Sequence, residues 1–105
     1  MILENILHNL KCLNNDIAYI INDKTYTYSE IYKMVCNLYE FMKNNCDNKS
    51  PILIYGHKDV SMIVSFISCS FLGLAYIPID TSIPKNRIDV IIKQANPQLI
   101  IRKHN

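Results

Sequence analysis

The sequence predicts an α/β fold, in which a helix, a β-hairpin and a second helix over residues 1–45 precede a βαβαβ unit over residues 51–102. Three short, continuously apolar runs alternate with helical patterns in the second half, which is typical of parallel strands joined by helices. A polar, turn-rich stretch from Asn44 to Ser50 separates the two halves. The 105 residues, of which 50% are hydrophobic and 19% charged, are enough for one core and are expected to form a single subdomain.

The first half opens with an amphipathic pattern. Leucine and isoleucine recur at helical spacing over residues 2–13, which predicts a helix that ends at the polar run after Leu13. Two β-rich runs follow, residues 18–21 and 24–27, on either side of the turn-forming pair Asn22-Asp23. This arrangement predicts a hairpin.

A second helix is predicted from Thr27 to about Asn44. Thr27 and Glu30 have the spacing of a capping box. In this motif the threonine hydroxyl accepts a hydrogen bond from an otherwise unpaired backbone N–H, and the glutamate carboxylate accepts one from the backbone N–H of the cap residue. One face of this helix is expected to be apolar, with Ile31, Met34, Val35, Leu38 and Phe41 on it.

The second half reads as strand, helix, strand, helix, strand. Asp59 is expected to cap the first of these helices, Gly73 to end it, and Pro84 to lie in the first turn of the other. Asn96-Pro97 ends that second helix. The three predicted strands are 52–55, 75–79 and 99–101.

Charge and cysteine usage exclude several classes of function. A net charge of +2 without a basic cluster argues against a nucleic-acid partner. The four cysteines have no metal-ligand spacing, and Cys36 and Cys69 lie in apolar runs as small hydrophobes, so a reduced, cytoplasmic chain is expected. The N-terminus lacks the features of a signal peptide.

Residues 60–79 contain no charge and are long enough to cross a bilayer. Four serines, Gly73 and Pro78 divide the run into a helix and a strand. We therefore expect burial inside an α/β domain and no insertion into a membrane.

Ligands bind parallel sheets beyond the carboxyl ends of the strands, which here means residues 56–59, 80–85 and 102 onward. No glycine-rich phosphate loop lies there. For His57, a loop histidine bonded to a backbone carbonyl is favoured over a catalytic base, because no titratable partner can be assigned from the sequence. Lys58 reads as a solvated cation.

Asp80 has two interpretations. It is expected to cap the helix that begins near Pro84 or to pair with Arg87, and the functional alternative is a ribose or metal ligand. Four tyrosines lie in the predicted hairpin and the start of the following helix, namely Tyr19, Tyr26, Tyr28 and Tyr32. They lack interleaved basic residues, so a hairpin packed on that helix is favoured over a stacking surface.

Two segments, Tyr26–Ile31 and Phe71–Asp80, resemble the first two core motifs of the adenylate-forming (AMP-binding) enzymes, the superfamily of acyl-CoA synthetases and adenylation domains. Phe71-Leu72 stands where that family usually has Lys-Ala. Further segments look like the D-alanine:carrier-protein ligase branch of the superfamily, namely Ser50–His57, Met62–Phe66 and Ser82–Ile88.

The resemblance implies the N-terminal subdomain of a ligase that uses ATP and Mg²⁺ to adenylate D-alanine. The alanyl group would then pass to the phosphopantetheine thiol of a carrier protein, for teichoic acid D-alanylation. The alternatives are another amino-acid adenylation domain, an acyl-CoA synthetase, or a non-catalytic interaction module.

The resemblance also implies that this chain is a fragment. The family's phosphate loop, substrate pocket and catalytic lysine have no counterpart here, so no catalytic, cofactor-binding or metal-binding residue can be assigned to any position. The isolated chain is expected to be inactive and to hold no cofactor. Its partner would be the remainder of the ligase, and its open strands, the third above all, are expected to favour self-association.

Overall fold

The computed structural model describes residues 17–21, 24–57 and 59–102. The helix expected over residues 2–13, the turn at Asn22-Asp23, and Lys58 lie outside this part. The predicted hairpin is confirmed, with β1 (Ile17–Ile21) antiparallel to β2 (Lys24–Thr27).

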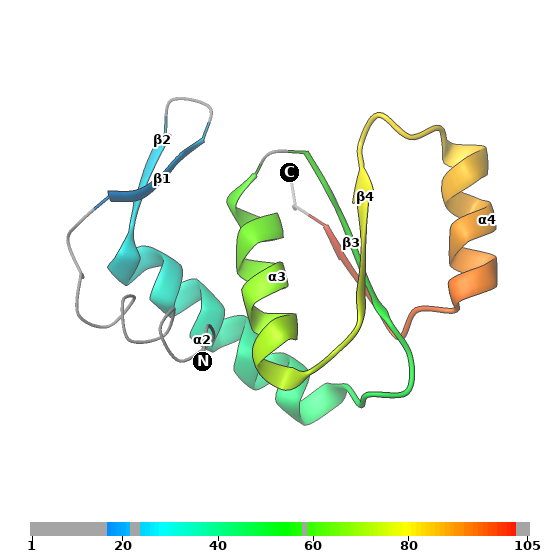
Figure 1. The fold of residues 1–105 in the computed structure, drawn as a ribbon, viewed down its shortest axis with the longest axis horizontal. Coiled ribbons are helices and arrows are strands. Elements are labelled where there is room, and N and C mark those ends of the chain that lie inside the picture. Colours follow the sequence, from blue (N-terminus) through cyan, green and yellow to red (C-terminus); the bar gives the residue numbers. More distant parts are fainter. Residues whose placement is uncertain (1–16, 22–23, 58, 103–105) are drawn as a thin grey trace.

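The helix α2 (Tyr28–Asn45) begins at the predicted capping box (Figure 1). The Glu30 N–H donates to Thr27 Oγ1 over 3.2 Å, and the Thr27 N–H donates to Glu30 Oε1 over 3.2 Å. The expected apolar face is wrong at one position. Phe41 is 49% exposed, whereas Met42 is fully buried, because steps of four, three and four residues from Ile31 end at Met42.

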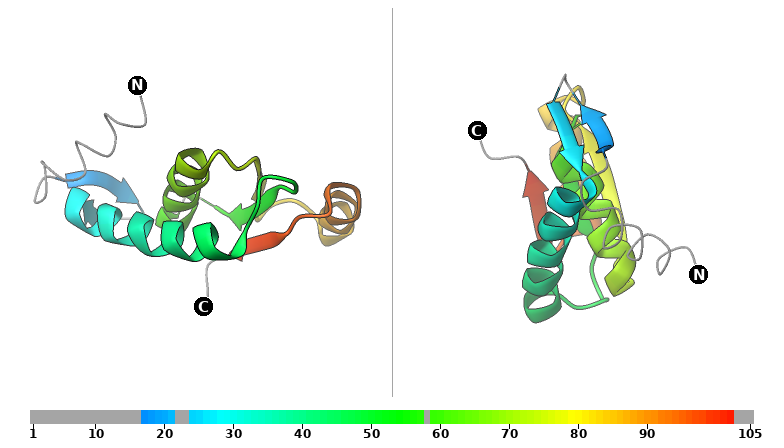
Figure 2. Two further views of the ribbon diagram at one scale, coloured as in Figure 1. Left: turned by 90° about the horizontal axis from the view of Figure 1, so that it is seen from below. Right: turned by 90° about the vertical axis from the view of Figure 1, so that its left-hand side faces the viewer.

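The second half forms a three-stranded parallel sheet with the order β4-β3-β5. Its strands are β3 (Ile52–Gly56), β4 (Tyr76–Asp80) and β5 (Leu99–Arg102), joined by α3 (Val60–Leu72) and α4 (Lys85–Ala95). The helices α2 and α3 lie on one face of the sheet and α4 lies on the other (Figures 1 and 2). The predicted α/β class with a parallel sheet is therefore confirmed.

The predicted ends of α3 and the predicted end of α4 are confirmed, but Pro84 is the N-cap residue before α4 and does not lie in its first turn. The Asp59 side chain accepts a bond from the Met62 N–H at the start of α3, and Gly73 ends that helix with a left-handed φ of 67°. Asn96 ends α4 in the same region, at a φ of 48°. Every helix among the described residues is too short or too polar to span a bilayer.

The core has two clusters, and both lie on the α2–α3 side of the molecule. Met42 packs with Ile52, Ile54 and Cys69, and Ile31 packs with Val35 and Val64. As expected, Tyr26, Tyr28 and Tyr32 pack around the second cluster. The serines of α3 fit an apolar helix because their hydroxyls bond to backbone carbonyls one turn back, as in Ser65 to Ser61 and Ser68 to Val64.

One side chain holds the polar stretch over residues 44–50 in place through hydrogen bonds. Gln98, just before β5, accepts a bond from the Asp47 N–H and donates to the carbonyls of Asp47 and Ser50. The two halves also pack together directly through α2 and α3. The polar stretch thus connects the halves as an ordered loop.

The three strands differ in how deeply their side chains are buried. Ile52, Leu53 and Ile54 of β3 are at most 1% exposed, whereas Tyr76 of β4 is 37% exposed and Ile100 of β5 is 46% exposed. Both outer strands have one edge without a partner strand among the described residues. Self-association through this side stays a prediction.

Candidate functional site

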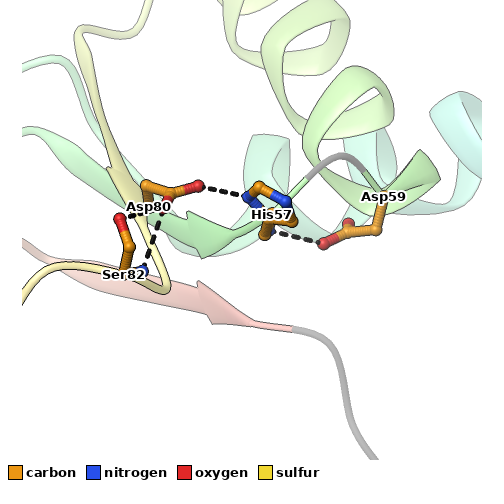
Figure 3. A network of polar contacts seen from close by, with 4 residues as sticks. All are labelled: His57, Asp59, Asp80 and Ser82. Atoms are coloured by element: carbon orange, nitrogen blue, oxygen red, sulfur yellow. Dashed lines mark hydrogen bonds and ion pairs between the residues drawn. The ribbon is translucent and has the colours of Figure 1, made fainter.

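The carboxyl ends of β3 and β4 bring together the polar residues that the sequence singled out. Because these strands are parallel and in register, Gly56 lies beside Asp80, and His57 follows one residue later. Figure 3 shows His57 and Asp80 pointing toward each other, with Asp59 and Ser82 beside them.

His57 and Asp80 form a hydrogen-bonded pair. Nδ1 of His57 lies 2.7 Å from Oδ1 of Asp80, and the two side chains are 55% and 41% exposed. An ionised carboxylate only accepts hydrogen bonds, so Nδ1 carries the proton and donates it. Within the part of the chain that the structure describes, no group bonds to the other ring nitrogen, Nε2.

Asp80 also organises the turn that follows β4. Its Oδ2 atom accepts bonds from the Ser82 N–H, over 2.9 Å, and from the Ser82 hydroxyl. The bond from the Ser82 hydroxyl and the bond from His57 hold the pKa of Asp80 well below its usual range, and the Ser82 N–H adds to this effect. Asp80 is therefore a carboxylate at any physiological pH.

Asp59 accepts hydrogen bonds within the loop between β3 and α3. Oδ1 accepts bonds from the Met62 N–H, over 3.1 Å, and from the Ser61 hydroxyl, while Oδ2 accepts the His57 N–H over 3.2 Å. The packing favours glycine at position 56, since a Cβ atom there would lie 2.6 Å from Oδ2 of Asp59 and 2.9 Å from Cγ of Met62 and would displace these side chains. The first turn of α3 is thus occupied by a carboxylate of its own loop.

Two expectations about these residues are corrected. His57 bonds to the Asp80 carboxylate instead of a backbone carbonyl, so the statement that it has no titratable partner is wrong. Asp80 neither caps α4 nor pairs with Arg87. Pro84 precedes α4 without a side-chain cap bond, and Asp80 bonds to Ser82 and His57 instead.

The sequence contained a signal for the pair. The two residues are 23 positions apart, but each stands at the carboxyl end of one of two consecutive parallel strands. The prediction missed the pair because it treated the two loops separately.

The chemistry of this arrangement is limited. An imidazole that a carboxylate orients, on a side chain that is half exposed, can accept or donate one proton or one hydrogen bond. The nearby hydroxyls, Ser61 and Ser82, are both bonded to aspartates. Among the described residues, no group of three or more His, Cys, Asp or Glu side chains is placed to hold a metal ion. The network therefore ties the β3–α3 and β4–α4 loops together.

Fold and sequence together define the class of protein. A three-stranded parallel sheet with helices on both faces makes the described part of the chain an α/β domain. Residues 8–105 match the AMP-binding enzyme family, and the chain belongs to this family.

The relatives that this chain matches are much longer proteins. A D-alanine–D-alanyl carrier protein ligase of Bacillus anthracis is 33% identical over 85 residues, which are 80% of this chain and 17% of that enzyme. The enzyme of the same name from Bacillus mycoides gives the same values. The chain thus spans about a sixth of the length of the curated relatives that it matches.

Solved structures confirm the fold. The adenylation domain AlmE of Vibrio cholerae, in complex with glycyl-adenosine-5′-phosphate, superimposes with a TM-score of 0.78 at 20% identity, over 92% of this chain and 18% of that one. The N-terminal subdomain of NpsA from Klebsiella oxytoca gives a TM-score of 0.73 at 19% identity, over 95% of this chain and 26% of that one. The predicted fold, an N-terminal subdomain of the adenylate-forming enzymes, is confirmed.

Proposed function

We propose that this chain is the N-terminal subdomain of an ATP-dependent ligase that joins D-alanine to a carrier protein. The observation that carries the proposal is the 33% identity to the Bacillus ligases over 80% of the chain. Support also comes from the segments Ser50–His57 and Ser82–Ile88, which look like that branch of the family.

The proposed reaction has two steps. The carboxylate of D-alanine attacks the α-phosphorus of Mg²⁺-bound ATP, which forms D-alanyl adenylate and releases pyrophosphate. The phosphopantetheine thiol of the carrier protein then attacks the alanyl carbonyl, which forms a thioester and releases AMP. The alanyl group would go on to teichoic acid, and both steps would take place in the cytoplasm.

In this proposal the chain serves as scaffold for the rest of the ligase. Its parallel sheet would support the larger part of the enzyme, and its carboxyl edge is already bonded internally through His57, Asp80 and Asp59. ATP, Mg²⁺ and the carrier protein would be bound with the help of polypeptide beyond the region matched here.

A second candidate is an adenylation domain for another amino acid. It is favoured by the structural likeness to AlmE, whose complex contains a glycyl adenylate. A third candidate is a non-catalytic module made of these 105 residues.

The test begins with the coding sequence beyond residue 105. The protein that carries this region, with whatever follows it, is assayed for ATP–pyrophosphate exchange with D-alanine, L-alanine and glycine in parallel. A phosphopantetheinylated carrier and its unmodified form then serve as matched acceptors for the alanyl group.

We expect exchange that depends on D-alanine and loading of the modified carrier only. Exchange with glycine or L-alanine and not with D-alanine would favour the second candidate. A stop codon directly after residue 105 would favour the non-catalytic module.

A further inference from the structure

The helix α4 is held to the molecule less firmly than the other two helices that the structure describes. It has no buried residue, and Val90 on it is 52% exposed. The helices α2 and α3 pack closely against each other, whereas α4 makes only sparse close contacts with any helix or strand. The free energy that keeps α4 in place is therefore small compared with that of the α2–α3 pair.

The helix is also marginal by itself. Its 11 residues are fewer than the roughly 12 to 15 that an isolated helix needs in water. Four of them are isoleucine or valine, whose β-branched side chains lower the helix propensity. Pro84 precedes α4 without a side-chain cap bond, so this helix lacks the cap that Thr27 and Asp59 supply to α2 and α3.

Hydrogen bonds fix the chain on both sides of α4 without involving the helix. Before it, Asp80 at the end of β4 bonds to His57 and Ser82. After it, the Gln98 side chain donates to the Ser50 carbonyl. These bonds can persist when α4 unfolds, so the segment that opens is limited to the residues between Ser82 and Gln98.

The face of the sheet beneath α4 is apolar. Leu53 of β3 and Ile79 of β4 are 1% and 3% exposed, yet neither belongs to the two clusters on the α2–α3 side. Side chains alternate along a strand, so Leu53 points away from the face that carries Ile52 and Ile54 and toward the side of α4 (Figure 2). The register of β3 and β4 places Ile79 on the same face as Leu53.

We propose that α4 is a flap, which unfolds and refolds as a unit while α2, α3 and β3 stay folded. Each opening uncovers the apolar face of the sheet that bears Leu53 and Ile79. Such an opening needs less free energy than global unfolding, because it breaks only the contacts that α4 makes with the rest of the chain. It also exposes less surface, so urea promotes it less than it promotes global unfolding.

Native-state hydrogen exchange of the 105-residue chain, in increasing urea below the unfolding transition, tests the proposal. The exchange rates of backbone amides in α4 are compared with those in β3, and the amides of α3 are the internal control for a helix of similar length. We expect α4 amides to exchange at least about a hundredfold faster than β3 amides and with a weaker dependence on urea. The amides of α3 should follow those of β3.

One substitution separates local from global opening. Ile54→Ala lies in a cluster on the α2–α3 side, which stays intact when α4 opens. It should speed exchange in β3 at least about thirtyfold, which corresponds to about 2 kcal/mol, and leave exchange in α4 unchanged. Ile54→Val gives the same comparison with a rise of about threefold in β3, should the alanine variant not fold.

The matched control is Ile20→Ala, which removes the same atoms from a residue that is 68% exposed. It should change the exchange rates of neither α4 nor β3.

Equal exchange rates and an equal urea dependence in α4 and β3 would overturn the proposal, because α4 would then open only with the whole domain. An equal acceleration of both elements in Ile54→Ala would overturn it for the same reason. Exchange of the α4 amides at the rate of an unstructured peptide would also overturn it, since α4 would then not be folded in the parent chain.

Discussion

The central strand and the outer helix of this domain differ sharply in how they are packed. Ile52, Leu53 and Ile54 of β3 are at most 1% exposed, whereas α4 contains no buried residue and Val90 on it is 52% exposed. The sequence of β3 is apolar, whereas that of α4 mixes isoleucines and a valine with charged residues. The difference shows that packing energy is concentrated where α2, α3 and β3 meet, while the side formed by α4 and β5 is a surface with apolar groups left in contact with water.

We expect the largest difference in stability between two truncations of isoleucine, one in the central strand β3 and one in the outer strand β5. Ile54→Ala should lower the free energy of unfolding by about 2 to 5 kcal/mol, because it leaves a cavity under α2 and α3. Ile100→Ala removes the same atoms from a residue that is 46% exposed and should cost less than about 1 kcal/mol. Urea unfolding followed by circular dichroism measures both. Equal losses would mean that the β5 side is packed as tightly as the centre.

The two glycines allow a second comparison. Gly56→Ala places a Cβ atom 2.6 Å from Oδ2 of Asp59 and should cost about 1 to 3 kcal/mol through displacement of the helix cap. The Cβ atom of Gly73→Ala has no other atom within 4 Å, so only the left-handed φ of 67° should lower the free energy of unfolding, by about 1 kcal/mol. Thermal unfolding of the two variants gives the order. A larger loss for Gly73→Ala would contradict the close packing at Gly56.

Substitutions in the capping box at the start of α2 should lower the stability by a smaller amount. Thr27→Ala removes the acceptor of the Glu30 N–H bond and should cost about 1 kcal/mol, and Glu30→Ala should cost less. The melting temperature of each variant checks this. An unchanged melting temperature for Thr27→Ala would show that the capping box contributes nothing to stability.

The smallest effect concerns pH at the carboxyl edge of the sheet. Hydrogen bonds from Ser82 and His57 lower the pKa of Asp80 in the folded chain. The contribution of the Asp80 carboxylate to the free energy of unfolding is therefore complete above the pKa of about 4 in the unfolded chain, and it is lost as the pH falls below that value. The stability advantage of the parent over Asp80→Asn should therefore shrink on acidification. Asp89→Asn on α4 is the control and should follow the parent. A constant difference between pH 7 and pH 3 would contradict the assignment.

Elements set by nearby residues could be predicted from the sequence. The capping box at Thr27, the stop at Gly73 and the hairpin before α2 each depend on residues within a few positions of one another, and the structure has them as expected. The parallel pairing of the strands followed from their apolar character and from the helices between them.

Features that depend on distant partners were missed. The bond from His57 to Asp80 requires the register of β3 and β4, which no local pattern reveals. The exposure of Phe41 was missed for a related reason. Both Phe41 and Met42 can lie on one apolar stripe of α2, and only the packed structure shows that Met42 is the buried one.

We expect this region to serve as scaffold and not to bind nucleotide by itself. The first turn of α3 would be the natural place for a phosphate, but the Asp59 carboxylate already accepts the Met62 N–H there. Isothermal titration of Mg-ATP into the 105-residue chain tests this expectation. We expect no measurable binding, and a dissociation constant in the micromolar range would contradict the scaffold role.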